Sequence, residues 1–321
     1  MTHYPAILAL QPGATPAGDG PIGPAIAAFT WCVTGPTCDV VLQRVDGTQV
    51  TLLTDVGDTP VSLSPDGTWL VYLRRDATIL RNLLTGATQR LPTYRRPLSW
   101  SPNSRWLMFE GNDGGDFIVR DVVSGVEGSN LHPLPAPTAS VYPTPPPPGP
   151  YYPAAVTDHG QVVRYERPDT PTPVGTFALD VVDPASMAAR PIPVSLNSPS
   201  GLRPAAQVPA APLLGDTLYL KMSLDGAMSL LPLSVTTGHT GAVVRVTAPG
   251  STQPVRFTAD PIDPGWTTVA ALPGQGLVCR VKGRGANGDD LVAVDPTTGR
   301  SRQLTHIREG WPAALAALPG R

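Results

Sequence analysis

The chain has 321 residues and a formal net charge of −2, and it contains 40 prolines and 32 glycines. Because proline inside a helix costs about 3 kcal/mol, this composition excludes a fold built from long helices. The 41% share of hydrophobic residues excludes a disordered chain, and the small net charge excludes broad attraction to nucleic acid or to an anionic membrane surface. An all-β protein with many turns satisfies these limits.

At the N-terminal end, the first thirty residues lack the basic start and continuous apolar run of a signal peptide. No run of about eighteen apolar residues follows, so we expect no membrane span. The sequence leaves open whether the protein is cytoplasmic or an exported domain whose leader has been removed. Cys32 and Cys38 flank a turn in WCVTGPTCDVV and form either a disulfide or two free thiols, whereas Cys279 in GLVCRV is expected to be buried.

Two short patterns then recur along the chain. The first begins with a residue that is usually aromatic or arginine. This residue is mostly followed by proline and then by a short apolar strand, at residues 4–13, 59–67, 96–104, 152–160, 203–211, 266–276 and 311–320. The second is a hairpin with a polar or glycine turn, at residues 40–54, 79–92, 117–132, 177–193, 243–258 and 291–305. With a middle strand between them, each unit predicts four antiparallel strands over roughly fifty residues. Six such units predict an all-β fold, a six-bladed β-propeller.

The clearest copies of the repeat are SPDGTWLVY (64–72) and SPNSRWLMF (101–109), each followed by a hairpin with an L-x-T-G-like turn. This pattern resembles the propeller repeat of TolB-type proteins, also called PD40 or WD40-like repeats. Residues 59–92 and 96–132 match it well, and the other units match in outline. The resemblance covers nearly the whole chain and implies a bacterial protein with one propeller domain over residues 1–321. It implies little about function, because such propellers serve many roles.

Seven copies of the first pattern accompany only six hairpins, so residues 4–10 and 312–318 duplicate one element. We expect one copy to complete the first blade as its innermost strand. The other copy is then spare, pairs at an edge, or lines the channel. A seven-bladed ring with one degenerate blade is the alternative.

In a propeller, the residues just before each innermost strand gather around the central channel at one face. Here they are expected to form a concave site for a protein segment or for an anionic or aromatic small molecule. The alternative is that these side chains plug the channel and stack on neighbouring blades. The predicted residues are Tyr4, Arg95, Arg96, Tyr151, Tyr152, Arg203, Trp266 and Trp311.

A proline-rich insertion at residues 133–150 is expected between the third and fourth blades, on the same face. Its four consecutive prolines favour a stiff polyproline II conformation with little order to lose on binding. It is interpreted as a segment that docks into a partner domain, as a lid over the channel, or as a solvated connector.

Patterns for catalysis and metal binding are missing from the sequence. It has no G-x-S-x-G, its five histidines lack zinc spacing, and the loops at 110–116 and 282–290 lack the spacing of a calcium loop. We therefore expect no metal and no cofactor, and we predict a monomeric binding module. The alternative is a metal-independent cyclase, isomerase or hydrolase at the channel mouth, using Asp58, Tyr152 or Glu309.

Overall fold

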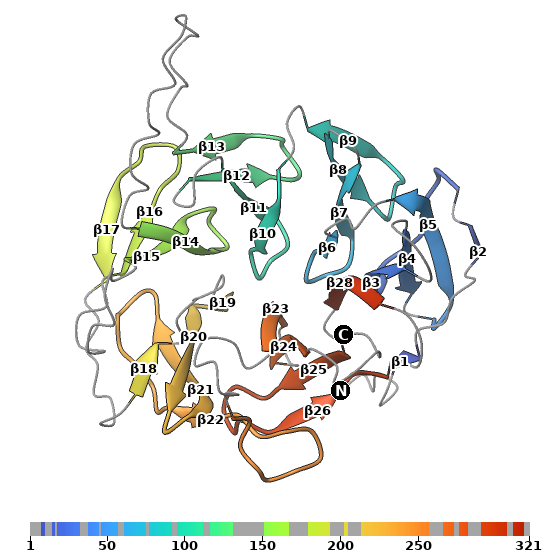
Figure 1. Ribbon diagram of the computed structural model, residues 1–321. Coiled ribbons are helices and arrows are strands. Elements are labelled where there is room, and N and C mark those ends of the chain that lie inside the picture. Colours follow the sequence, from blue (N-terminus) through green and yellow to red (C-terminus); the bar gives the residue numbers. More distant parts are fainter. Residues whose placement is uncertain are drawn as a thin grey trace, which may run out of the picture.

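The computed structural model describes residues 8–9, 15–16, 18–32, 38–44, 46–56, 61–74, 77–91, 95–111, 116–130, 151–166, 179–192, 202–204, 213–256, 266–272, 276–281, 290–306 and 311–317. Within these ranges the regular structure is β-strand, arranged as six blades around a common axis (Figure 1). The predicted six-bladed β-propeller is therefore confirmed. The insertion at 133–150 lies outside the described residues.

Blades 2, 3 and 4 have the predicted four antiparallel strands, which follow one another from the axis outwards. In blade 2 they are β6 (Val61–Leu63), β7 (Trp69–Arg74), β8 (Ala77–Asn82) and β9 (Thr88–Leu91). In blade 3 they are β10 (Pro97–Trp100), β11 (Trp106–Glu110), β12 (Phe117–Asp121) and β13 (Glu127–Ser129). In blade 4 they are β14 (Tyr151–Val156), β15 (Val162–Glu166), β16 (Leu179–Val182) and β17 (Ala189–Ile192).

Blade 6 also has four strands, whereas the innermost strand of blade 5 is divided. The two short strands β18 and β19 both pair with β20. The strands of blade 5 are β18 (Leu202–Pro204), β19 (Leu213–Leu214), β20 (Thr217–Leu224), β21 (Ala227–Ser234) and β22 (Val244–Arg245). Those of blade 6 are β23 (Trp266–Leu272), β24 (Gly276–Val281), β25 (Asp290–Val294) and β26 (Ser301–Gln303).

Residues 243–258 do form a hairpin turn, with the antiparallel bridge Thr247↔Pro254, but the prediction that this turn is the outer hairpin of blade 5 is wrong. The hairpin is formed instead by β21 and β22, around the turn VTTG at 235–238. The hydroxyl of Ser234 closes this turn by accepting a hydrogen bond from the amide of Thr237 at 3.1 Å, and Gly238 supplies the positive φ of 74°. A polar turn that ends in glycine, like the outer turns of other blades, is therefore present in VTTG, before the turn that the prediction used.

The chain closes the ring in the first blade, here called the closing blade. The C-terminal strand β28 (Trp311–Ala317) is its innermost strand and pairs antiparallel with β3 (Ala25–Cys32). Outside β3 follow β4 (Cys38–Arg44), β5 (Gln49–Val56) and, parallel to β5, the short β2 (Thr15–Pro16). The N-terminal copy of the repeated pattern contributes β1 (Leu8–Ala9), which pairs at an edge with β27 (Thr305–His306).

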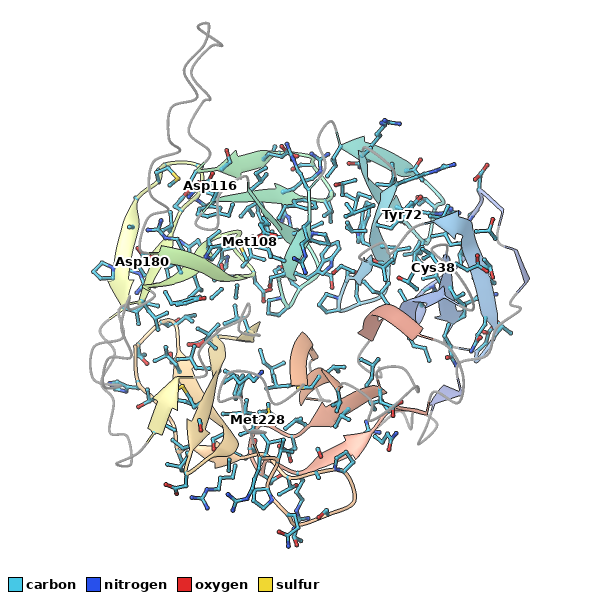
Figure 2. The ribbon with its side chains drawn as sticks, viewed as in Figure 1. Cys38, Tyr72, Met108, Asp116, Asp180 and Met228 are labelled. Atoms are coloured by element: carbon cyan, nitrogen blue, oxygen red, sulfur yellow. The ribbon has the colours of Figure 1, made fainter. Side chains whose placement is uncertain are left out.

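The hydrophobic core is divided into clusters that lie between successive blades (Figure 2). Phe109 belongs to the cluster between blades 2 and 3, Met108 to the one between blades 3 and 4, and Met228 to the one between blades 5 and 6. The cluster around the closing blade reaches both of its neighbours, blades 2 and 6. Middle strands such as β11, β12 and β25 thus bury both faces, because alternate side chains point to opposite neighbours.

The turns between the third and fourth strands explain the L-x-T-G pattern. In four blades the first turn residue is aspartate or asparagine, and its side-chain oxygen accepts backbone N–H groups two and three residues later at 2.8–3.3 Å. These first residues are Asn82, Asp121, Asp183 and Asp295. Such turns end at a residue with positive φ, which is why glycine recurs there.

The structure also decides one of the choices left open for the cysteines. Cys38, at the start of β4, is disulfide-bonded. Cys279 is a buried thiol that takes part in no disulfide, as expected for a small core residue. The side chain of Cys32, the third cysteine of the chain, lies outside the described residues.

Candidate functional site

The predicted mouth residues with a described backbone stand where the innermost strands begin. There they face the end of the second strand, in the pairs Tyr151↔Glu166, Arg203↔Ser223, Trp266↔Val281 and Trp311↔Cys32. Arg96 has the same position in blade 3, because its carbonyl oxygen accepts a hydrogen bond from the amide of Glu110 at 2.9 Å. The blades repeat around one axis (Figure 1), and in each of them the chain enters at the start of the innermost strand. These backbone positions therefore lie on one face of the ring, here called the mouth face.

The side chains of most mouth residues lie outside what the structure describes. Tyr4 is outside the described ranges altogether. For five further residues only the backbone is described, so the convergence of their side chains on the axis stays a prediction. These are Tyr151, Tyr152, Arg203, Trp266 and Trp311.

Arg95 and Arg96 are the mouth residues with described side chains, and they differ in their surroundings. The amide of Arg95 donates to the Thr78 hydroxyl at 2.7 Å, and that hydroxyl donates to the Arg95 carbonyl oxygen at 2.9 Å. The Arg95 guanidinium donates to Glu127 on β13 at 2.9 Å. Arg96 is exposed, and no hydrogen bond or ion pair joins its side chain to another described residue. Arg95 therefore ties blade 2 to blade 3, while Arg96 faces solvent.

Two further arginines join neighbouring parts of the ring, and neither was predicted from the sequence. Arg120 on β12 donates to Glu127 and to Gln89 of blade 2, each at 2.7 Å. Arg81 on β8 is buried and donates from Nη2 to the carbonyl oxygens of Gly18 and Gly20, each at 2.9 Å. The sequence does contain a pattern that could have identified them. Each arginine directly precedes the aspartate or asparagine that starts the outer turn, in LRNLLTG and VRDVVSG.

Near the axis, one tryptophan links two innermost strands. The indole N–H of Trp100 on β10 donates to the Ser62 hydroxyl on β6 at 3.0 Å. A hollow of about 240 Å³ among the described residues lies away from the axis, beside the closing blade, where Arg44 and Val50 line it. In the described part of the chain, no group of three or more histidine, cysteine, aspartate or glutamate side chains is arranged to hold a metal ion.

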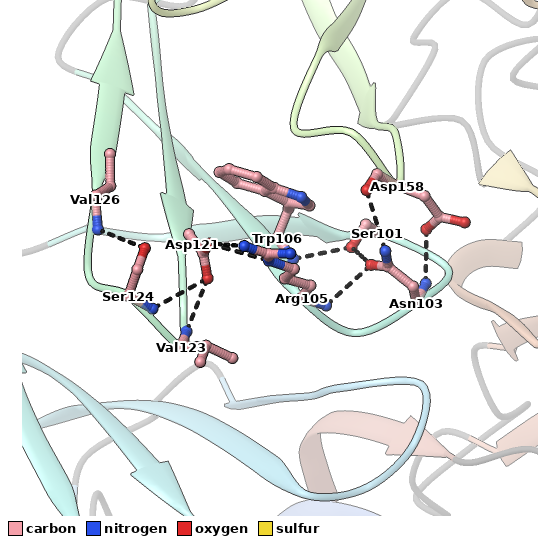
Figure 3. A network of polar contacts seen from close by, with 9 residues as sticks. All are labelled: Ser101, Asn103, Arg105, Trp106, Asp121, Val123, Ser124, Val126 and Asp158. Carbon is pink, nitrogen blue, oxygen red and sulfur yellow. Dashed lines mark hydrogen bonds and ion pairs between the residues drawn. The ribbon is translucent and has the colours of Figure 1, made fainter.

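The face opposite the mouth face carries a network of hydrogen bonds between hairpin turns (Figure 3). The backbone amide of Asn103 donates to the Asp158 carboxylate at 2.7 Å, which joins the turn of blade 3 to the turn of blade 4. Within blade 3, Ser101 accepts from the Trp106 amide at 2.9 Å. The Trp106 ring is covered by Gly160 of blade 4, where an added Cβ would come within 2.8 Å of the ring. These contacts hold the turns of neighbouring blades in register.

Asp121 is the strongly perturbed acid of this network. Burial acts to raise its pKa, but the Arg105 guanidinium and the amides of Val123 and Ser124 outweigh burial and lower the pKa to about 2. Arg105 donates to one Asp121 oxygen from Nε at 3.0 Å and from Nη2 at 2.7 Å. The arrangement serves stability, because the carboxylate is buried and all its described partners belong to its own blade.

The pH dependence of unfolding tests the ion pair of Asp121 and Arg105. Because the folded-state pKa of Asp121 is depressed, its contribution is present above the ordinary pKa and is lost as the pH falls towards 2. We expect a loss of about 1–2 kcal/mol in the free energy of unfolding, reduced from the full linkage value because Arg105 is half exposed. Urea unfolding at pH 5 and pH 2.5 measures it. In Asp121→Asn this component of the difference is absent, and an unchanged difference would contradict the assignment.

No protein-family model matches the sequence, and the search of curated proteins finds no match either. In the described part of the chain, we find no helix with the length and hydropathy that crossing a membrane requires.

Solved structures do resemble the fold. TolB from Acinetobacter baumannii superposes with a TM-score of 0.51 at 15% identity, over 92% of this chain and 67% of that one. A structure described as a TolB protein, from Agrobacterium tumefaciens, gives 0.49 at 12% identity, over 93% and 100% of the two chains. A prolyl endopeptidase gives 0.48 at 16% identity, over 88% of this chain and 42% of that one. The blade order and the likeness to the Acinetobacter protein together show that this chain has the fold of a TolB-type β-propeller.

Proposed function

We propose that this propeller is a binding module that holds its ligand at the mouth face, around the ring axis. The ligand is a protein segment or an anionic or aromatic small molecule. The observation that carries the proposal is Arg96, an exposed arginine with no described partner, at the start of an innermost strand. In four other blades tyrosine, arginine or tryptophan occupies the corresponding backbone position. Aromatic and arginine side chains dominate the energetics of protein binding sites.

The contacts of Arg95 support this role for its neighbour. Its backbone is fixed to Thr78 through two hydrogen bonds, and its side chain is fixed to Glu127. Arg96 therefore stands on a backbone that is held between two blades, so little backbone order is lost when a ligand binds. An anionic group of the ligand, such as a carboxylate, would pair with its guanidinium in a charge-assisted hydrogen bond.

The test compares variants in a capture experiment from a lysate of the native host, read by mass spectrometry for proteins and small molecules. We expect Arg96→Ala to weaken retention of the wild-type ligand about tenfold, and Arg96→Ala with Arg203→Ala to weaken it further. The melting temperature should barely change, because exposed side chains without partners contribute little to stability.

Arg300 provides the matched control, because it is also exposed but lies in the turn between β25 and β26, on the opposite face. Arg300→Ala should retain the ligand like the wild type. Equal retention by all variants would exclude the mouth face as the binding site. A large fall in melting temperature with unchanged retention would indicate that these side chains plug the channel instead of binding a ligand. A small molecule that is chemically altered on incubation would instead indicate an enzyme.

A further inference from the structure

The outer edge of the closing blade differs from the outer edges of the other blades. Its strand β5 has 8 residues, whereas the outermost strands of the other five blades have 2 to 4. Short length limits the pairing that an exposed edge offers to another chain. β5 is longer than any of these strands as described, so short length does not protect its outer side.

Charged residues are sparser along β5 than along the outer strands of the other blades. Each of the five short outer strands carries a charged residue, and charge discourages edge-to-edge pairing. These residues are Arg90, Glu127, Arg190, Arg245 and Arg302. β5, QVTLLTDV, also carries one, Asp55, but its first six residues, QVTLLT, are uncharged. They are rich in the β-branched and apolar residues that favour strand pairing.

In the described part of the chain, this edge is covered only briefly. β2 lies parallel to β5 along its outer side, with the residue pairs Thr15↔Val50 and Pro16↔Thr51 (Figure 1). Pro16 has no backbone N–H, so it donates no hydrogen bond to β5. Along residues 52–56 no described residue pairs with the outer side of β5. A two-residue parallel pairing with one proline is a weak cover for a strand of this length.

The segment that follows β2 is anchored elsewhere, on blade 2. The carbonyl oxygens of Gly18 and Gly20 accept hydrogen bonds from the buried Arg81 at 2.9 Å. The amides of Ile22 and Gly23 both donate to the carbonyl oxygen of Leu83 at 2.9 Å. Because these contacts do not involve β5, β2 can leave the edge while residues 18–23 stay attached and the ring stays closed through β28.

A hollow of about 240 Å³ lies beside the start of this edge, lined by Gly18, Gly20, Pro21, Ile22, Arg44 and Val50. Arg44 is 3.7 Å from the Asp46 carboxylate, which already accepts hydrogen bonds from the amide and hydroxyl of Thr48. At 3.7 Å the guanidinium makes no hydrogen bond to Asp46, so it keeps donors for another acceptor. In strand addition, main-chain hydrogen bonds supply affinity and such side-chain hollows supply specificity.

We propose that the outer edge of β5 is a docking site for an extended segment of a partner protein, which pairs with β5 in place of β2. The segment is largely uncharged, with an acidic side chain where it passes Arg44. β2 pairs with the same edge and therefore competes with that segment. This site is separate from the mouth face, and the proposal does not depend on the function proposed there.

The test supplies the covering strand in trans. The probe is a fluorescent synthetic peptide with the sequence of residues 8–20, LALQPGATPAGDG, and the protein is the full chain. The wild type should bind it weakly, because its own β2 competes at a high effective concentration. In Thr15→Pro both residues of β2 lack an N–H, so this variant should bind the peptide at least about tenfold more tightly. Hydrogen exchange of residues 49–56 should slow when the peptide binds.

Thr54→Pro provides the blocking control. Thr54 is exposed and has no partner in the register between β4 and β5, so proline there interrupts the edge without removing a ladder pair. Added to Thr15→Pro, it should abolish peptide binding while leaving the far-ultraviolet circular dichroism unchanged. Equal peptide binding by wild type and Thr15→Pro, or binding that survives Thr54→Pro, would overturn the proposal. So would a concentration-dependent dimer of Thr15→Pro in sedimentation, since it would assign the edge to a second copy of this chain.

Discussion

A chain that ends at residue 310 is expected not to form a stable ring. It lacks β28, which pairs with β3 at five residue positions and is the innermost strand of the closing blade. Without it, the buried strand β3, with Ala27, Ala28 and Thr30 at 0% exposure, loses its inner partner. The lost ladder and burial amount to about 5–10 kcal/mol, which equals the whole stability of an ordinary domain.

Urea unfolding followed by circular dichroism measures this loss. The full chain should unfold cooperatively, and the chain ending at residue 310 should show no cooperative transition. A chain ending at residue 317 keeps all of β28 and should behave like the full chain. If the shorter chain unfolded cooperatively at the same urea concentration, β28 would not be the closure of the ring.

Gly299→Ala is expected to be the most damaging single substitution in the contact between blades 5 and 6. Gly299 has a φ of 71°, and an added Cβ would overlap the backbone carbonyl oxygen of Arg245. Its own carbonyl oxygen accepts a hydrogen bond from the Thr247 amide at 2.9 Å, so the two backbones cannot separate freely. The strained φ and the overlap together should cost about 2–5 kcal/mol.

Gly250→Ala separates the two contributions. Gly250 has nearly the same φ, 69°, but an added Cβ there meets no atom within 4 Å. This variant should lose only the conformational part, about 1–2 kcal/mol. Chemical unfolding of both variants beside the wild type gives the difference. Equal losses would mean that blades 5 and 6 are not packed as closely at Gly299 as the structure has them.

The two proposed sites use different chemistry, and their tests do not depend on each other. The mouth face would bind through side chains, with Arg96 as its exposed described member. The β5 edge would bind through backbone hydrogen bonds, which any extended segment can supply. A protein that used both would hold two partners on surfaces set at right angles, one at the end of the ring and one at its rim.

Much of the fold was determined by the sequence alone, because its signals are local. The turn SPDG, the L-x-T-G turns and the alternating apolar strands each depend on residues within about ten positions of one another, and their repetition sets the number of blades. The seventh copy of the first pattern also predicted that an element would be duplicated. The outer hairpin of blade 5 was misplaced because the sequence contains two glycine-containing turns there, VTTG and APGS. Local preferences do not show which of the two joins the third and fourth strands.

Only the tertiary structure decided which duplicate closes the ring, since the copies at 4–10 and 312–318 look alike and differ only in their distant partners. It also separated Arg95 from its neighbour Arg96, by pairing the first with Glu127, thirty-two residues away. The arginines that join blades and the long edge of β5 are likewise properties of contacts between distant segments. Local residue preferences specify turns and strands, whereas pairing between remote strands depends on the packing of the whole ring, which no short stretch of sequence contains.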